Sequence, residues 1–190
     1  ILGISIAAGT ATDLAGNSAS AATSATFTVD NSLPAPTIGA PSASFSRTGP
    51  VTYTVTYTDA NFNASILTAA NVTLNRTDSA NGTVTVSGSG NARTITLSSL
   101  TGNGTLSVSI AQGTASDLAG NLAPSAGPSA TLTVDNAVPT VTIGAPSSTF
   151  ASAGPVTYAV AYADANFNAS TLAAGAVTLK QQNLLSHVQL

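Results

Sequence analysis

Apolar and hydroxyl-bearing residues alternate strictly along residues 50–59, which read Pro-Val-Thr-Tyr-Thr-Val-Thr-Tyr-Thr-Asp. A period of two is typical of a β-strand with one buried face. Residues 155–164 repeat this segment and keep each Tyr and Val. Ala replaces Thr at three positions of the repeat, namely 159, 161 and 163. Because only one face changes, we predict that the Tyr and Val face is packed and that the Thr face is not.

Other short runs with strand-like patterns follow, each bounded by Gly, Asn, Asp or Pro, and an edge strand is expected at residues 36–40. The further runs are residues 71–74, 83–86, 94–97, 105–110 and 130–134. Seven short strands in about 100 residues are typical of an immunoglobulin-like (Ig-like) β-sandwich. The predicted class is therefore all-β, and residues 63–70 are expected to add no more than a helical turn.

The chain also repeats itself over a long period. Residues 9–17 (Gly-Thr-Ala-Thr-Asp-Leu-Ala-Gly-Asn) return with one change at residues 113–121, an offset of 104, and Ile38 returns as Ile143, an offset of 105. A unit of roughly 105 residues suits a small domain rather than a solenoid turn. We therefore expect a tandem array, with one complete seven-stranded domain flanked by two partial domains. The expected boundaries are 1–31 for the C-terminal part of one domain, 32–136 for a complete domain, and 137–190 for the N-terminal part of a third.

Three motifs resemble the bacterial Ig-like repeats of large surface proteins and adhesins. They lie at residues 117–121 (Asp-Leu-Ala-Gly-Asn), 134–139 (Val-Asp-Asn-Ala-Val-Pro) and 154–158 (Gly-Pro-Val-Thr-Tyr). The resemblance covers residues 1 to about 179 and implies a structural spacer or stalk, located outside the cell or at the cell surface of a bacterium. The tail at residues 180–190 departs from the repeat and is expected to be aberrant.

Composition excludes several other classes of protein. Charged residues make up 6% of the chain and its net charge is −3, which excludes a basic nucleic-acid-binding surface. No apolar run approaches the roughly 18 residues of a membrane span, so we expect no membrane insertion. Without Cys, and with a single His in the tail, the chain has no Ser-His or Cys-His pair and no thiolate metal site. We predict that the protein is not an enzyme.

The seven acidic residues are all Asp, and six of them form three repeated pairs. Strand order in an Ig-like sandwich should bring Asp30, Asp59 and Asp117 together where one domain joins the next. Carboxylate and carbonyl oxygens are the ligands that Ca²⁺ takes. A calcium site is therefore predicted at the junctions. Its candidate ligands are Asp13, Asp30, Asp59, Asn61, Asp117, Asn121, Asp135, Asp164 and Asn166.

A simpler interpretation of the same residues is that each Asp forms a turn by accepting hydrogen bonds from nearby backbone N–H groups. Calcium would stiffen the array, whereas Asp residues that only form turns would leave the linkers loose. Both interpretations remain open at this point.

The partial domains suggest an alternative function and also a simpler explanation of where the chain begins and ends. Open half-sandwiches have unpaired edges and apolar faces, so the closing part of one molecule could accept the opening part of the next. That would make the chain a subunit of a head-to-tail extracellular filament built by strand complementation, although the strands at residues 83–97 have no counterpart in either part. The simpler explanation is that the chain is a fragment of a longer array.

The second alternative function is a carbohydrate- or surface-binding module that uses the Thr face.

Overall fold

The structure is a computed structural model that describes residues 1–180, and it is all-β apart from two short 3₁₀ turns. Its contacts divide the chain into two units, residues 1–136 and 137–190, so one boundary falls after Asn136. In the part of the chain that the structure describes, no helix is long and apolar enough to cross a membrane.

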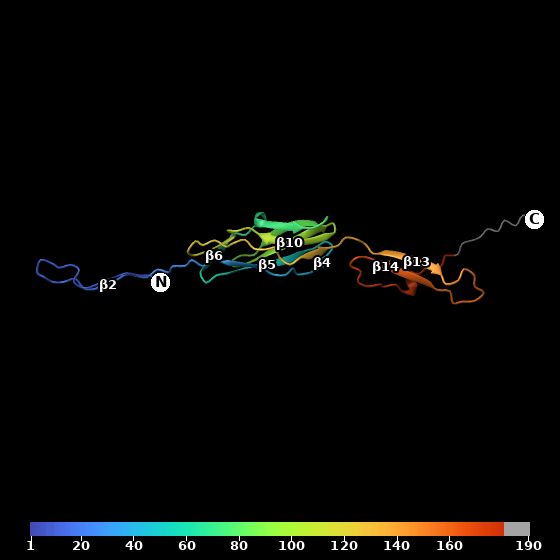
Figure 1. Cartoon of the computed structure of the whole chain (residues 1–190), viewed down its shortest axis with the longest axis horizontal. Coiled ribbons are helices and arrows are strands. Elements are labelled where there is room, and N and C mark those ends of the chain that lie inside the picture. Colours follow the sequence, from blue (N-terminus) through green and yellow to red (C-terminus); the bar gives the residue numbers. More distant parts are fainter. Residues whose placement is uncertain (181–190) are drawn as a thin grey trace, which may run out of the picture. The chain divides into compact units, whose positions relative to one another are not determined.

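Residues 32–136 fold into two four-stranded sheets (Figure 1). The first has the order β3 (Ala35–Ile38), β5 (Val51–Thr58), β9 (Ala92–Thr101), β8 (Asn81–Ser87). The second has the order β4 (Phe45–Ser46), β12 (Leu132–Val134), β10 (Gly104–Ile110), β7 (Val72–Arg76). All neighbours are antiparallel except β12 and β4, which run parallel. A separate two-stranded sheet joins β6 (Phe62–Ser65) to β11 (Ala115–Asp117).

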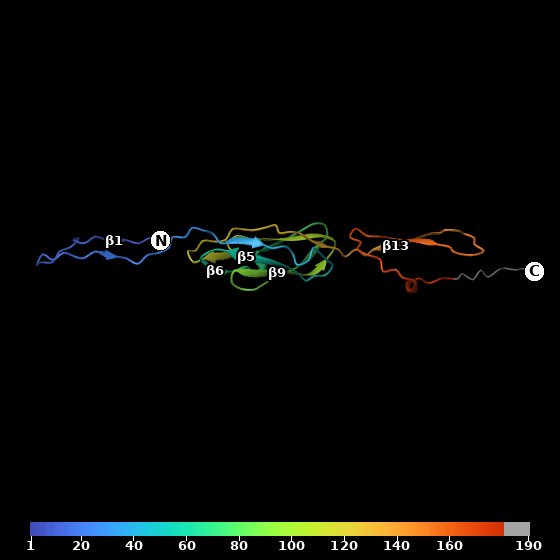
Figure 2. The same ribbon diagram turned by 90° about the horizontal axis from the view of Figure 1, so that it is seen from below.

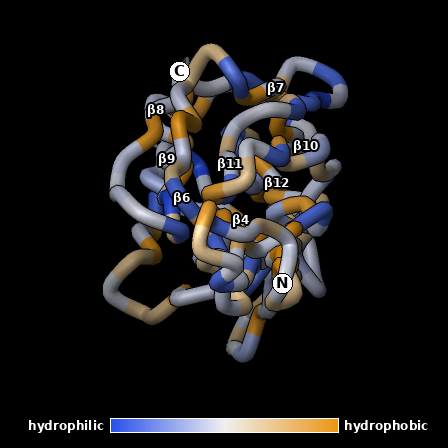
Figure 3. The backbone as a smooth tube through the Cα atoms, turned by 90° about the vertical axis from the view of Figure 1, so that its left-hand side faces the viewer, coloured by the Kyte–Doolittle hydropathy of each residue, from blue (hydrophilic) through white to orange (hydrophobic). Residues whose placement is uncertain are grey.

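The strand alternation seen in the sequence decides which residues enter the core. On β5, Tyr53, Val55 and Tyr57 are completely buried, while Thr54 and Thr58 on the opposite face are exposed. The prediction for this strand is therefore confirmed. Apolar residues of both sheets form one hydrophobic core, and Figure 3 shows orange, hydrophobic positions at strands that include β7, β10 and β12.

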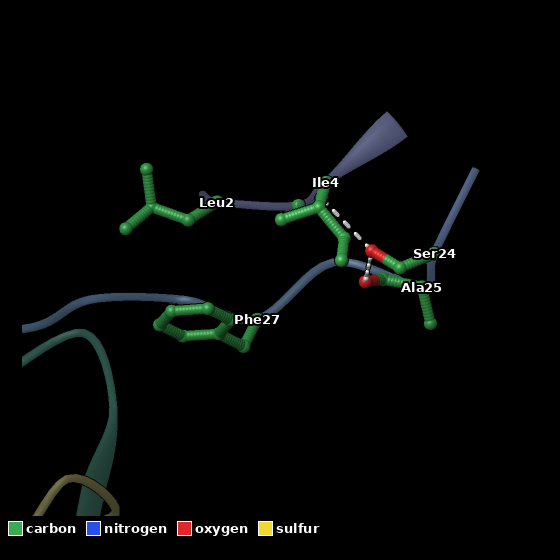
Figure 4. A pocket seen from close by; sticks show the side chains of 6 residues that line it. Leu2, Ile4, Ser24, Ala25 and Phe27 are labelled. Atoms are coloured by element: carbon green, nitrogen blue, oxygen red, sulfur yellow. Dashed lines mark hydrogen bonds between the residues drawn. The ribbon is translucent and has the colours of Figure 1, made fainter. Parts of the chain in front are cut away.

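Residues 1–29 form a hairpin with its own two-stranded sheet, drawn in blue in Figures 1 and 2. It contains β1 (Ser5–Ile6) and β2 (Ala22–Thr23), and Leu2 pairs with Phe27 beyond them. The repeat predicts the last two strands of a domain here, at residues 2–7 and 25–29. The first is shortened to Ser5–Ile6, and the second is wrong in position, because the continuous strand lies at Ala22–Thr23 and residues 25–29 contain only the isolated bridge of Phe27 (Figure 4). The large apolar side chains of this hairpin are exposed.

The second unit is built around the hairpin of β13 (Thr140–Pro146) and β14 (Tyr158–Ala163), followed by the 3₁₀ turn η2 (Ala174–Ala176). The repeat predicts the first three strands of a domain in this unit, but no third strand is formed over residues 164–180. In the complete domain the corresponding strand β7 pairs with β10, and this unit contains no copy of β10. The missing partner explains the missing strand. The aberrant tail, apart from Lys180, lies outside the described residues.

The helical turn expected at residues 63–70 is displaced. Residues 62–65 form β6, because they pair with β11, and the turn η1 follows at Ala69–Asn71. The short strands β4, β6 and β11 were not predicted.

Candidate functional site

Three carboxylates from distant parts of the sequence meet at one end of the complete domain. Asp30 lies in the linker after the hairpin, Asp59 follows β5, and Asp117 ends β11. One carboxylate oxygen of each lies within 4.8 Å of those of the other two. Asp117 is buried, with 1% of its surface exposed, and the other two are half-buried. Their predicted convergence is confirmed.

The loop at residues 117–121 closes on its own aspartate. Asp117 accepts hydrogen bonds from the Asn121 backbone N–H (2.7 Å, to Oδ1) and from the Asn121 side-chain amide (2.7 Å, to Oδ2). Gly120 has φ +91°, a conformation that other L-residues rarely adopt. The spacing Asp-x-x-Gly-Asn therefore specifies a tight loop that holds the buried carboxylate.

A second turn carries Asp59. Its Oδ1 accepts a hydrogen bond from the Asn61 backbone N–H at 2.7 Å. The Asn61 carbonyl oxygen in turn accepts the N–H of Leu118 at 2.8 Å. The two loops are thus joined by their backbones, and this fixes the separation of Asp59 from Asp117.

The linker residue Asp30 is tied to both loops. The Asn61 side-chain amide donates to Asp30 Oδ2 at 2.6 Å, and the Asn121 side-chain amide donates to the Asp30 carbonyl oxygen at 3.0 Å. The backbone N–H of Ser32 donates to Asp30 Oδ1 at 2.9 Å. The hydrogen bond from Asn61, followed by that from Ser32, lowers the pKa of Asp30 below its ordinary value. We call Asp30, Asp59, Asn61, Asp117 and Asn121 the Asp–Asn junction.

The geometry of the Asp–Asn junction is compatible with a divalent cation. Two oxygens that bind one Ca²⁺ at 2.3–2.6 Å lie at most about 5 Å apart, and the three carboxylates meet this condition. The carboxylates would supply the first ligands, and backbone carbonyls or water the others. The two Asn amides now direct N–H groups at Asp30 and Asp117, so they would have to turn to offer oxygen.

The hydrogen bonds of the Asp–Asn junction support the turn-forming interpretation directly. Asp30, Asp59 and Asp117 each accept a backbone N–H from a residue two or four positions later. Turn formation and cation binding are not exclusive, since a carboxylate oxygen has more than one lone pair. The calcium site stays a prediction.

The remaining predicted ligands lie elsewhere. Asp13, in the hairpin of residues 1–29, accepts bonds from the backbone and side chain of Asn17, and these bonds lower its pKa. Asp135 belongs to the first unit, whereas Asp164, which accepts the N–H of Asn166 at 2.8 Å, belongs to the second. The turns of Asp13 and Asp164 are each formed within their own unit.

Two residues that donate hydrogen bonds to these aspartates, Asn17 and Ser32, were not identified from the sequence. Asn17 lies 104 residues before Asn121, so the repeat itself identifies it as a partner for Asp13. Ser32 contributes only its backbone N–H, and side-chain identity carries no signal for such a contact.

Other buried polar groups in the complete domain also have structural partners. The Tyr57 hydroxyl donates to Thr114 Oγ1 at 2.7 Å, and Arg93 donates to the backbone carbonyls of Ser65 and Leu67. Over residues 1–180, no buried side-chain nitrogen or oxygen lacks a hydrogen-bond partner. The polar interior is therefore used to hold loops and strands in place.

Comparison with models of known protein families, with curated proteins and with solved structures finds no match. The resemblance to bacterial Ig-like repeats therefore rests on the sequence motifs.

Proposed function

We propose that this chain is a tandem Ig-like module that serves as a non-enzymatic spacer in a large extracellular or cell-surface bacterial protein of the adhesin type. The strand order supports the Ig-like assignment. The sheets β3-β5-β9-β8 and β4-β12-β10-β7 match the ABED and GFC sheets of Ig domains, with β4 as an additional first-strand segment. The repeat of about 105 residues supports the tandem arrangement.

The observation that carries the spacer proposal is the Asp–Asn junction. Two side-chain amides of the complete domain, from Asn61 and Asn121, bind the linker residue Asp30. A spacer needs its linkers restrained, because the stiffness of each linker sets how far the array reaches. Asp135 and Asp164 are the sequence equivalents of Asp30 and Asp59 in the next repeat.

Backbone ¹⁵N relaxation tests whether this junction restrains the linker. We expect residues 1–29 of the wild-type chain to share the overall tumbling of residues 32–136. In the double variant Asn61→Ala, Asn121→Ala, residues 1–29 should tumble independently of residues 32–136. Asn63→Ala is the matched control and should behave like the wild type, because the Asn63 amide donates to Ser116 and not to Asp30. Independent motion in the wild type would contradict a restrained junction.

Calcium at the Asp–Asn junction is the second part of the proposal. Titration calorimetry with Ca²⁺ should give saturable binding that Asp117→Asn weakens strongly. Asp78→Asn removes the same charge at the one Asp outside the repeat and should leave binding unchanged. Absence of binding heat, together with no stabilisation of the fold by Ca²⁺, would leave the aspartates as turn formers only, without affecting the spacer proposal.

A carbohydrate-binding module is less well supported. Sugar sites use exposed aromatic rings for stacking, and Tyr53 and Tyr57 are completely buried in the complete domain.

A further inference from the structure

The strand β8 (Asn81–Ser87) forms one edge of the first sheet of the complete domain. Edge strands expose unpaired N–H and C=O groups, and proteins protect them with short length, Pro or charged residues. Among the other edge strands of the two four-stranded sheets, β3 contains Pro36, β4 has two residues, and β7 ends with Arg76. By contrast, β8 has seven residues and contains neither Pro nor a charged residue. It is therefore the unprotected edge of this domain.

The backbone bonds of β5 show how the polar groups of the sheet are directed. In an antiparallel pair, a residue directs its N–H and its C=O to the same side, and the side alternates along the strand. Thr54 accepts the N–H of Gly39, on the β3 side, at 2.8 Å. Tyr57 donates to the carbonyl oxygen of Asn91, on the β9 side, at 2.8 Å. The even-numbered residues of β5 therefore bond β3, and the odd-numbered residues bond β9.

The same alternation continues through β9 to β8. Ile95 pairs with an odd-numbered residue of β5, so it bonds β5, and the next residue, Thr96, bonds β8. Thr96 pairs with Thr85, so Thr85 directs its backbone groups to β9. Val84 and Val86 therefore direct their N–H and C=O groups away from the sheet. These four groups form no hydrogen bond within residues 1–180.

The free part of β8 ends on either side of Val84 and Val86. The N–H of Gly82 is already bonded to the side-chain oxygen of Asn81, at 2.9 Å. At the other end, Gly88 has φ +88° and is not extended. Two residues with four unpaired polar groups thus define what we call the open edge.

We infer that the open edge binds the open edge of a second copy of this chain, with the two strands antiparallel. Two identical edges are related by a two-fold axis, and an axis at Thr85 places Val84 opposite Val86 of the second copy. Each such pair exchanges two N–H···O=C bonds, so all four free groups of each copy are satisfied. Moving the axis by one residue would require Gly82, whose N–H is bonded, or Gly88, which is not extended.

The size and charge of the open edge are consistent with a weak contact between copies. Five residues of a strand span about 17 Å, so the interface belongs to the class below about 1,200 Å², in which transient complexes are found. No charged residue lies on β8, and a net charge of −3 per chain gives little repulsion. A second copy also fits better than an unrelated peptide, because pairing satisfies the same four groups on both partners.

This contact goes beyond the spacer proposal, because it joins two molecules side by side. It uses only the complete domain and does not depend on a restrained linker. Failure of one proposal would therefore leave the other unaffected.

Disulfide trapping tests the pairing on the full chain, which contains no cysteine of its own. Residues opposite each other in a non-hydrogen-bonded antiparallel pair have Cα atoms about 4.5 Å apart, which is within the range of a disulfide. Thr85 lies on the axis, so Thr85→Cys should form a disulfide-linked dimer under mild oxidation. Thr54→Cys is the matched control, because Thr54 is exposed on the same face of this sheet but belongs to the inner strand β5.

The rates of dimer formation decide between pairing and random collision. Folded Thr85→Cys should form dimers at least about tenfold faster than Thr54→Cys, because pairing raises the effective concentration of the two thiols. In concentrated urea, where β8 is unfolded, both variants should react at the same rate. Equal rates for the two folded variants would overturn the inference.

A mixture of Thr83→Cys and Ser87→Cys tests the register. An axis at Thr85 places Thr83 opposite Ser87 of the second copy, so the mixed disulfide dimer should exceed both homodimers. Mass spectrometry distinguishes the three products. A statistical mixture, or an excess of either homodimer, would contradict the proposed antiparallel pairing.

Amide NMR measures the same contact without a covalent link. We expect the N–H signals of Val84 and Val86 to shift as the concentration of the wild-type chain rises. Thr85→Lys should abolish these shifts, because like charges directly opposite each other repel, whereas Thr54→Lys should retain them. Both variants replace exposed side chains, and dispersed amide signals show that they are folded.

Signals that do not depend on concentration would overturn the inference. The same holds if only an added peptide of residues 82–88 shifts them, because the open edge would then bind an extended peptide rather than a second folded copy.

Discussion

Asp117 and Asp13 occupy equivalent places in the repeat and form the same bonds with an Asn four residues later. They differ in burial, because Asp117 is 1% exposed, whereas Asp13 is an exposed residue. Hydrogen bonds to a buried charged group cost more to lose than exposed ones. A comparison of Asp117 with Asp13 therefore separates the effect of burial on stability from the effect of the shared sequence motif.

Removing the buried carboxylate should destabilise the complete domain. Asp117→Ala leaves the backbone and side-chain N–H groups of Asn121 without their acceptor, and we expect a loss of about 1–3 kcal/mol in the free energy of unfolding. Asp13→Ala deletes the same bonds in the hairpin and should leave the domain unchanged. Urea denaturation measures both, and equal effects would contradict the structural role assigned to Asp117.

The acidity of Asp30 should depend on Asn61. The Asn61 amide is the main cause of the lowered pKa of Asp30, so Asn61→Ala should raise that pKa toward its ordinary value. Carbon-detected NMR titration of the Asp30 carboxyl measures the change, with Asn63→Ala as the control. An unchanged pKa in Asn61→Ala would exclude the amide as its cause.

The same shift sets the sign of the pH dependence. A carboxyl whose pKa is lowered by folding stabilises the folded linker above its ordinary pKa, and this stabilisation disappears as the pH falls through the lowered value. We therefore expect acid to release the linker in the wild type. Measurements of ¹⁵N relaxation should then show that residues 1–29 move independently of residues 32–136. Asn61→Ala should begin this transition at a higher pH.

Among the elements, β5 shows how the residue pattern sets the stability of a strand. Val55→Thr keeps the shape of the side chain but buries a hydroxyl among apolar residues, which should cost about 1–3 kcal/mol. Thr54→Val makes the reverse change on the exposed face and should alter stability by less than about 0.5 kcal/mol. Equal effects in chemical denaturation would contradict the burial of the Tyr and Val face.

The strands could be predicted where their own residues determine them. The alternation in β5 and its imperfect copy in β14 identified the buried face without any tertiary information. The short strands β6 and β11 were missed, because they exist through pairing with each other and neither has a long alternating pattern. The third strand of the second unit was predicted and is not formed, since its partner is absent from that unit.

Across the chain, the convergence of Asp30, Asp59 and Asp117 was predictable from the repeat together with strand order. The roles of Asn61 and Asn121 as amide donors to a linker residue were not, because a sequence does not specify which way an amide turns. Whether a cation also binds depends on the balance between carboxylate repulsion and these hydrogen bonds. The residue pattern does not determine the relative size of these two energies, so the sequence does not predict whether a cation binds.

The proposed spacer function requires residues 32–136 to be an autonomous domain that resists force, and single-molecule force spectroscopy tests this most directly. Pulling the chain from its two ends should give one discrete unfolding event that releases about 105 residues, or roughly 350 Å of contour length at 3.3–3.6 Å per residue, less the folded span. Gradual extension without a discrete event, or one event that releases nearly the whole chain, would contradict the claim.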